Sequence, residues 1–368
     1  MTEIFLTIFF ITVLLFFLGS GIWVGLSMIG VSAIGMILFT SRPVGDAMAT
    51  TIWGTASSWT LTALPLFVWM GEILFRTKLS ENLFKGLSPW MQKLPGGLIH
   101  VNVVGCALFA AISGSSAATV ATVGKMSIPE LRKRNYPEKI LLGSLAGSGT
   151  LGLLIPPSII LIIYGVAVQE SIAKLFIAGI IPGIMIALIF MSYVIIWSLI
   201  NKKEMPVVLE EYSFFEKIKR SKQLLPVIIL ISSVIGSIYT GIATATEAAS
   251  LGVVGALLLS YFQKTLNFET FKSSLLGATK TSCMIAFILA GSTFLSLAMG
   301  FTGLPRNLAV WIQNMDLSPY VLIFVLMIFY IILGMFLDGI SAVVLTMAII
   351  EPMIRQAGFD MIWFGIFL

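Results

Sequence analysis

Apolar residues in this chain run in long blocks that are separated by short polar and basic segments. A block of about 20 apolar residues is long enough to cross a bilayer as a helix. The pattern predicts an all-α polytopic membrane protein with full spans over 3–19, 21–40, 61–75, 139–168, 175–200, 224–241, 244–262 and 281–300. The composition agrees, because 58% of the 368 residues are hydrophobic and 11% are charged, unlike any soluble domain of this length.

Two further apolar blocks, 97–126 and 320–350, are interrupted at their centres by SGSSA (113–117) and LDGIS (337–341). Each block is too short for two crossings of about 20 residues and too interrupted for one. Each is therefore predicted to form a re-entrant helical hairpin with its tip inside the membrane.

The span at 139–168 contains adjacent prolines, Pro156 and Pro157, near its centre. Proline lacks the backbone N–H and clashes with the preceding turn, so the helix must break there. A broken helix is tolerated at membrane depth only where it lines a cavity or a site. The sequence therefore predicts an ion or substrate site at this break, next to Gly149, Thr150 and Gly152.

Basic residues indicate the orientation of the chain. The loops that hold 18 of the 22 Lys and Arg residues are 76–95, 125–139, 201–222 and 263–280. Loops rich in Lys and Arg stay in the cytoplasm, which predicts a periplasmic N-terminus. The same basic residues lie in short loops between spans, so the net charge of +5 does not indicate a nucleic-acid partner.

An internal repeat relates the two halves of the chain. PELRKRNYPEKI (129–140) aligns with PMIRQAGFDMIW (352–363), and the same offset of 223 residues places Ser115 on Asp338. The halves start on opposite sides of the membrane in this topology, which is the inverted repeat of many secondary transporters. The offset also places a second Pro-Pro break near 379, so we expect the chain to stop inside its second broken helix.

The repeat predicts three regions. The first inverted repeat covers 1–200 and contains scaffold spans at 1–75, the hairpin 97–126, the broken helix 139–168 and the span 175–200. A cytoplasmic connector covers 201–222, and a truncated second repeat with the hairpin 320–350 covers 223–368. The connector carries charged residues interleaved with aromatic ones, which favours a helix lying in the membrane interface over a lipid-regulatory site.

The first tip offers hydroxyl oxygens from Ser113, Ser115, Ser116 and Thr119. A hard cation such as Na⁺ needs several oxygen ligands, and helix breaks add free carbonyl groups. The helix that starts after the tip points the positive end of its dipole toward an anion. The alternative is that small residues here only permit tight helix packing.

The second tip carries Asp338 in an otherwise uncharged stretch. A carboxylate at membrane depth is costly and therefore indicates a functional site, although a structural ion pair or a helix cap is an alternative. Arg306, on the outer side of the second half, could receive a carboxylate substrate or could simply be solvated. The chain has no P-loop, no catalytic triad around its single His100 and no metal-ligand spacing, so we expect neither an enzyme nor ATP hydrolysis.

Several blocks of the chain resemble the large membrane subunit of the tripartite ATP-independent periplasmic (TRAP) transporters. The blocks, which occur in family order, are LTALPLFVWMGEIL (61–74), AAISGSSAATVATVGKMSIPELRKRNYP (110–137), TLGLLIPPSIILIIYG (150–165), KLFIAGIIPGI (174–184), GIATATEAASLGVV (241–254) and LGMFLDGISAVVL (333–345). The resemblance implies Na⁺-driven import of an organic acid, of C4-dicarboxylate or sialic-acid type, across the bacterial inner membrane. It also implies an elevator motion, a small four-helix membrane subunit and a periplasmic substrate-binding protein as partners.

The resemblance further implies which residues form the ion sites. The Na⁺ positions are Ser113, Gly114, Ser115, Gly149, Thr150, Pro156, Gly334, Asp338 and Ser341. The substrate positions are predicted from the residues themselves and not from the resemblance; they are Ser115, Ser116, Asp338, Gly339 and Arg306. Two other functions stay open: a carboxylate carrier that needs no binding protein, and a membrane scaffold subunit that does not transport.

Overall fold

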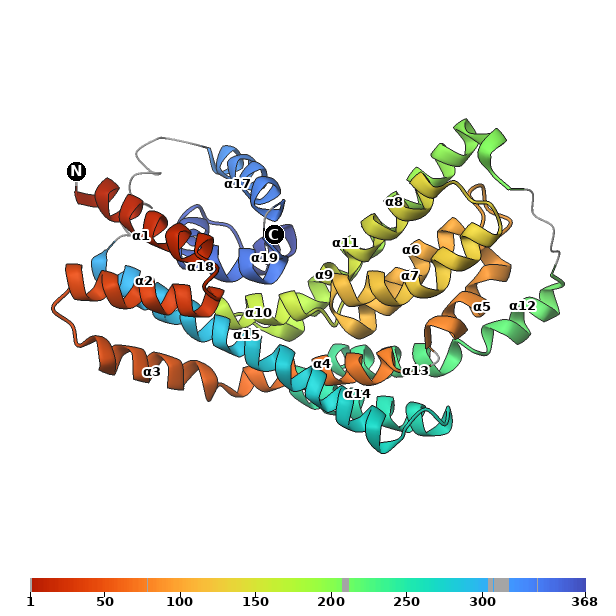
Figure 1. Ribbon diagram of the computed structural model, residues 1–368, viewed down its shortest axis with the longest axis horizontal. Coiled ribbons are helices and arrows are strands. Elements are labelled where there is room, and N and C mark those ends of the chain that lie inside the picture. Colours follow the sequence, from red (N-terminus) through yellow and green to blue (C-terminus); the bar gives the residue numbers. More distant parts are fainter. Residues whose placement is uncertain (1, 78, 207–211, 304–306, 308–317, 336) are drawn as a thin grey trace. The chain divides into compact units, whose positions relative to one another are not determined.

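The computed structural model describes residues 2–77, 79–206, 212–303, 307, 318–335 and 337–368 (Figure 1). Within these residues every regular element is a helix, as the hydropathy pattern predicts. The helices of the first half are α1 (Thr2–Gly19), α2 (Val24–Phe39), α3 (Val44–Ala56), η1 (Trp59–Thr62), α4 (Ala63–Phe75), α5 (Leu79–Met91), α6 (Ile99–Ser113), α7 (Ser116–Lys133), α8 (Glu138–Gly149), α9 (Leu151–Leu154), α10 (Ile159–Ala167) and α11 (Ile172–Ile200). The remaining helices are η2 (Lys202–Glu204), α12 (Phe214–Ser221), α13 (Leu225–Tyr239), α14 (Ala245–Phe262), α15 (Phe268–Thr302), α17 (Pro319–Gly334), α18 (Gly339–Gln356) and α19 (Met361–Phe367).

Several of these helices are long and apolar enough to cross a membrane. Among the described residues five helices meet this test alone, and there are up to seven spans if each bent helix pair counts as one. One bent pair consists of α3 followed by η1 and α4, and the other joins α12 to α13 at 58°. The chain is thus a polytopic helical membrane protein.

The structure differs from the sequence prediction in three helices. Helix α5 occupies a segment that was expected to be a loop, because it is not a continuous apolar run. The predicted span at 281–300 is the second part of α15, which begins earlier, at Phe268. The first hairpin also continues beyond 126, because α7 runs through Pro129 to Lys133.

The chain divides into two compact units, each built from separate segments. One unit contains residues 1–62, 162–171 and 281–368, and the other contains 63–161 and 172–280. In the first unit Met36, Phe294 and Ala298 form a buried cluster. In the second unit Val103, Ala110 and Leu151 form one. The predicted repeats divide the chain once along the sequence, whereas the compact units interleave. The units therefore do not test the repeats, which stay a prediction.

Helix boundaries recur along the chain at the offset of 223 residues. Helix α7 begins at Ser116 and α18 at Gly339, and both helices have 18 residues with an internal proline. The pairs α1 and α13, and α8 and α19, begin at equivalent positions, whereas α2 and α14 end at equivalent positions. The segments therefore turn at matching places in both halves.

The turn that follows α7 also recurs after α18. Asn135 and Gly358 occupy this equivalent position, and both have a positive φ, of 58° and 81°. The next residue donates its N–H to the helix in each case: Tyr136 to Leu131 O at 3.1 Å and Phe359 to Ile354 O at 3.2 Å. The left-handed conformation closes both helices in the same manner.

Candidate ion and substrate site

The break predicted at Pro156 and Pro157 is present. Helix α8 leads into the short α9, which ends at Leu154, and α10 resumes at Ile159. The two prolines are buried and are joined by a cis peptide bond. The Ser158 hydroxyl donates to Leu153 O. This bond gives a hydrogen-bond donor to one carbonyl group that lost its backbone donor at the helix break.

The first hairpin turns at Gly114. This residue ends α6 in the left-handed conformation, with φ at 58°, and its N–H donates to Ala110 O at 3.0 Å. Ser115 then caps α7 and accepts from Ala118 N at 3.5 Å. Two further bonds hold the turn: the Thr119 hydroxyl donates to Ser115 O at 2.7 Å, and the Ser113 and Thr119 hydroxyls lie 2.9 Å apart.

The first tip and the proline break lie against each other. Ile159 N donates to Gly114 O at 3.4 Å. A Cβ atom on Gly114 would approach Pro157 O to 2.9 Å, and one on Gly152 would approach the Ser115 carbonyl carbon to 3.0 Å. Backbone therefore meets backbone at this contact, and only glycine permits that approach.

The polar groups around the first tip differ in whether they already have a hydrogen-bond partner. The hydroxyls of Ser113 and Thr119 bond to each other, and the Thr150 side chain is exposed and donates to Gly147 O. The Ser116 hydroxyl is buried and has no hydrogen-bond partner among the described residues. A buried unpaired hydroxyl is costly, so Ser116 is the first-tip side chain with a free oxygen to offer a ligand.

Gly149 and Gly71 are positioned by close packing. A Cβ atom on Gly149 would lie 2.0 Å from Val120 Cγ2, so this glycine lets α8 cross close to α7. Gly71 on α4 approaches the end of α6, since its Cβ would lie 3.2 Å from Ser113 Cα and 3.3 Å from Ile112 O. Sequence reasoning missed Gly71, because a single glycine in an apolar helix carries no signal of what it packs against.

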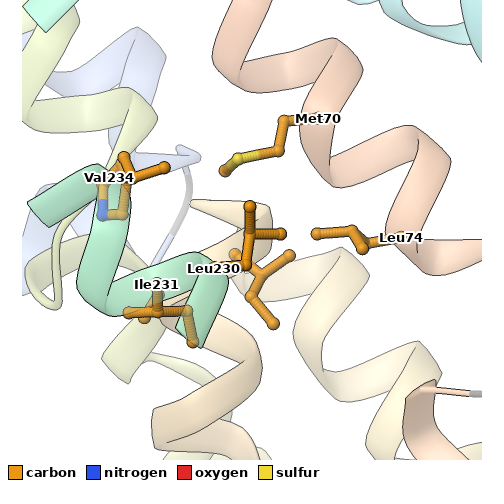
Figure 2. Close-up of a pocket in the computed structure, with 8 residues that line it drawn as sticks. Met70, Leu74, Leu230, Ile231 and Val234 are labelled. Atoms are coloured by element: carbon orange, nitrogen blue, oxygen red, sulfur yellow. The ribbon is translucent and has the colours of Figure 1, made fainter. Parts of the chain in front are cut away.

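An apolar pocket flanks the same tip within this unit. It is lined by Met70 and Leu74 of α4, by Ala111 and Ile112 of α6, by Pro157, and by Leu230, Ile231 and Val234 of α13. Figure 2 shows the α4 and α13 side chains facing one another. Hard cations bind oxygen ligands, and these apolar side chains have none. A cation at the first tip would therefore bind on a side other than this pocket.

The second tip repeats the helix start with a different side chain. Asp338 caps α18, and its Oδ2 accepts from Ile340 N at 3.1 Å and from Ser341 N at 3.2 Å. Asp338 is exposed, whereas Ser341 is buried. The helix cap, which was one alternative for this residue, is therefore present. Gly339 is the first residue of α18, Gly334 is the last of α17, and Arg306 lies outside the described residues.

One hydrogen bond joins the two helices of the second hairpin, and another joins the hairpin to α15 of the same unit. The hydroxyls of Tyr330 on α17 and Thr346 on α18 lie 2.7 Å apart. The Ser292 hydroxyl of α15 donates to Val344 O at 2.6 Å. The described residues contain no group of three or more His, Cys, Asp or Glu side chains that could hold a metal ion.

The order of these features, a hairpin tip on a proline break followed by a second capped tip, can be compared with known families. Residues 10–368 match the family model described as the tripartite ATP-independent periplasmic transporter, DctM component. The chain belongs to this family. Members of the DctM family are transporter permeases, so the chain is not an enzyme.

Three curated relatives align with this chain over most of their length. The chain is 32% identical to the C4-dicarboxylate TRAP transporter large permease protein of Pseudomonas aeruginosa over 341 residues, which are 92% of this chain and 79% of that protein. It is 31% identical to the sialic acid TRAP transporter large permease of Vibrio cholerae, covering 94% of this chain and 81% of that protein. It is 32% identical to the 2,3-diketo-L-gulonate large permease of Escherichia coli, covering 87% and 75%.

Proposed function

We propose that this chain is the large permease subunit of a Na⁺-coupled, binding-protein-dependent transporter that imports an organic acid across the bacterial inner membrane. Its hairpins, α6–α7 and α17–α18, are re-entrant in this proposal and move as part of an elevator-type inverted-repeat fold. The N-terminus is periplasmic, which agrees with the 18 Lys and Arg residues in the four loops assigned to the cytoplasm.

The observation that carries the proposal is the contact between the first tip and the proline break. Helices α6 and α9 end beside this contact, and α7 and α10 begin there. Helix ends leave carbonyl groups without intrahelical partners, and the Ser116 hydroxyl is unpaired. Such a set of neutral oxygens suits Na⁺, for which we assign Ser113, Gly114, Ser115, Gly149, Thr150 and Pro156. The second ion position takes Gly334, Asp338 and Ser341.

The substrate and the partners follow from the relatives. Their names give a C4-dicarboxylate, a sialic acid and a diketogulonate as substrates, all of which are organic acids. An anion is favoured at the start of a helix, and we assign Ser115, Ser116, Asp338, Gly339 and Arg306 to substrate contacts. We infer a small four-helix membrane subunit and a periplasmic substrate-binding protein as partners. One relative, the isethionate TRAP transporter permease protein DctMQ, is longer, and this chain covers only 53% of its length.

Uptake into proteoliposomes tests this function. The chain is reconstituted with its small membrane subunit, and uptake of radiolabelled succinate and N-acetylneuraminate is measured with and without a Na⁺ gradient and the binding protein. We expect accumulation of one of these acids only when both are present. Uptake with Na⁺ but without a binding protein would favour the self-sufficient carrier, and no uptake of any organic acid would favour the scaffold subunit.

A double variant, Pro156→Ala with Pro157→Ala, tests the ion site itself. Alanine lets α9 and α10 join into one helix, so the carbonyl groups at the break become paired. We expect Na⁺-driven uptake to be lost while the complex still elutes as one species in size-exclusion chromatography. The control is Pro182→Ala inside α11, which should keep transport; full uptake by the double variant would contradict the ion-site assignment.

A further inference from the structure

Helix α12 combines exposed aromatic residues with a high density of positive charge. Phe214 is 68% exposed and Phe215 is 78% exposed. The same short helix and its C-cap carry Lys217, Lys219, Arg220 and Lys222. Its one acidic residue, Glu216, is engaged in a capping box, in which the carboxylate accepts from Ser213 N at 3.1 Å.

Helix α12 is fixed to α5 through Trp90. The Trp90 indole N–H donates to the Ser221 hydroxyl at 2.7 Å, and its ring lies 6.2 Å from the Phe214 ring in an edge-on arrangement. The Lys217 ammonium lies 5.4 Å from the centre of the same indole. These three contacts hold α12 in one orientation, and α12 is bent by 58° away from the apolar α13.

Neither water nor the bilayer interior suits this helix. Two phenylalanines exposed to water forgo the gain from burial, whereas four cations within nine residues cannot lie among acyl chains at an acceptable cost. The membrane interface satisfies both groups, because aromatic rings enter the headgroup–acyl boundary while Lys and Arg remain at the level of the phosphates.

We propose that α12 binds the headgroups of anionic phospholipids and thereby ties α5 to the membrane surface. Basic clusters next to a membrane-spanning helix recognise anionic lipids through the negative surface potential. The consequence extends to α5, because Trp90 links α12 to the helix that precedes the first hairpin in the chain. This inference concerns lipid recognition and does not depend on which ion or substrate is transported.

Quenching of Trp90 fluorescence by brominated lipids tests the proposal. The full chain is placed in phosphatidylcholine nanodiscs that contain a minor fraction of either dibrominated phosphatidylglycerol or dibrominated phosphatidylcholine. The Trp90 signal is the difference between the protein and its Trp90→Phe variant. We expect the anionic lipid to quench Trp90 several-fold more than the zwitterionic one, because it is enriched beside the cations.

The triple variant Lys217→Gln, Lys219→Gln, Arg220→Gln should lower this preference several-fold, since each cation near the surface strengthens the attraction to anionic lipid. The control removes the same number of charges from the same compact unit, at Lys264, Lys272 and Lys280, and should keep the wild-type preference. Equal quenching by both lipids in the wild type, quenching by neither, or loss of the preference in the control would each overturn the proposal.

Discussion

The two hairpin tips share a backbone arrangement and differ in what surrounds it. In the first, the cap of α7 is the neutral Ser115, and glycine contacts at Gly114 and Gly152 bring the tip against the proline break. In the second, the cap of α18 is the charged and exposed Asp338, and a Cβ atom on the nearby Gly334 would meet nothing within 4 Å. The first tip is fixed by steric fit, whereas the second presents a charge.

The difference teaches that the two hairpins turn at matching positions but carry different chemistry at the turn. A serine and an aspartate are both good helix caps, so either can start the second helix of a hairpin. Only the aspartate brings a formal charge, and only the first tip has a described backbone contact with a broken helix. The two tips should therefore respond differently to equivalent substitutions.

The largest effect is expected from filling the first tip. Gly114→Ala places a side chain at a φ of 58° and 2.9 Å from both Ile159 N and Pro157 O. The left-handed conformation and the overlap each cost of order 1–3 kcal/mol, so we expect about 3 kcal/mol of destabilisation. Equilibrium unfolding in SDS-containing mixed micelles measures it. Gly334→Ala, at the end of α17, is the control and should change stability by less than about 0.5 kcal/mol; equal losses would disprove the difference in packing.

An intermediate effect is expected from Tyr136→Phe. The buried Tyr136 hydroxyl accepts from Leu98 N at 3.0 Å, and its removal leaves that N–H unpaired at a cost of about 2 kcal/mol. Phe359 is the equivalent residue in the second half and has no hydroxyl to make such a bond. Phe359→Tyr breaks no hydrogen bond, so it should leave the stability nearly unchanged. The same unfolding measurement compares the two, and a neutral Tyr136→Phe would show that the bond contributes nothing.

The pH dependence that burial of the Tyr136 side chain brings has a defined sign, although the hydrogen bond from Leu98 N opposes it. Burial raises the pKa of the Tyr136 phenol above its ordinary value of about 10. The folded state therefore holds this proton more tightly than the unfolded chain, and its contribution is complete below pH 10 and declines as the pH rises further. The cost of Tyr136→Phe should accordingly be the same at about pH 6 and about pH 9.

The smallest effect is expected at the helix caps. Ser115→Ala and Asp338→Ala each remove a cap at a cost of about 1 kcal/mol, whereas Asp338→Asn retains one. If Asp338 also contributes to an ion site, Asp338→Asn should keep wild-type stability and still require more Na⁺ for half-maximal uptake. Unchanged Na⁺ dependence in Asp338→Asn would leave the residue with capping alone.

Much of the architecture could be predicted from local sequence signals. Pro156 and Pro157 cannot continue a helix, and the small residues at 113–117 interrupt an apolar block, so the break and the first tip were located correctly. Helix α5 was missed because it lacks a continuous apolar run. The role of Gly71 and the interleaved compact units could not be predicted, since both depend on which helices pack together in three dimensions.

The recurring turn at Asn135 and Gly358 has a consequence for which residues these positions accept. Both positions need a left-handed backbone, with φ of 58° and 81°. Asparagine and glycine tolerate this conformation best, so they are two interchangeable solutions to one geometric demand. A β-branched residue at either position would strain the main chain.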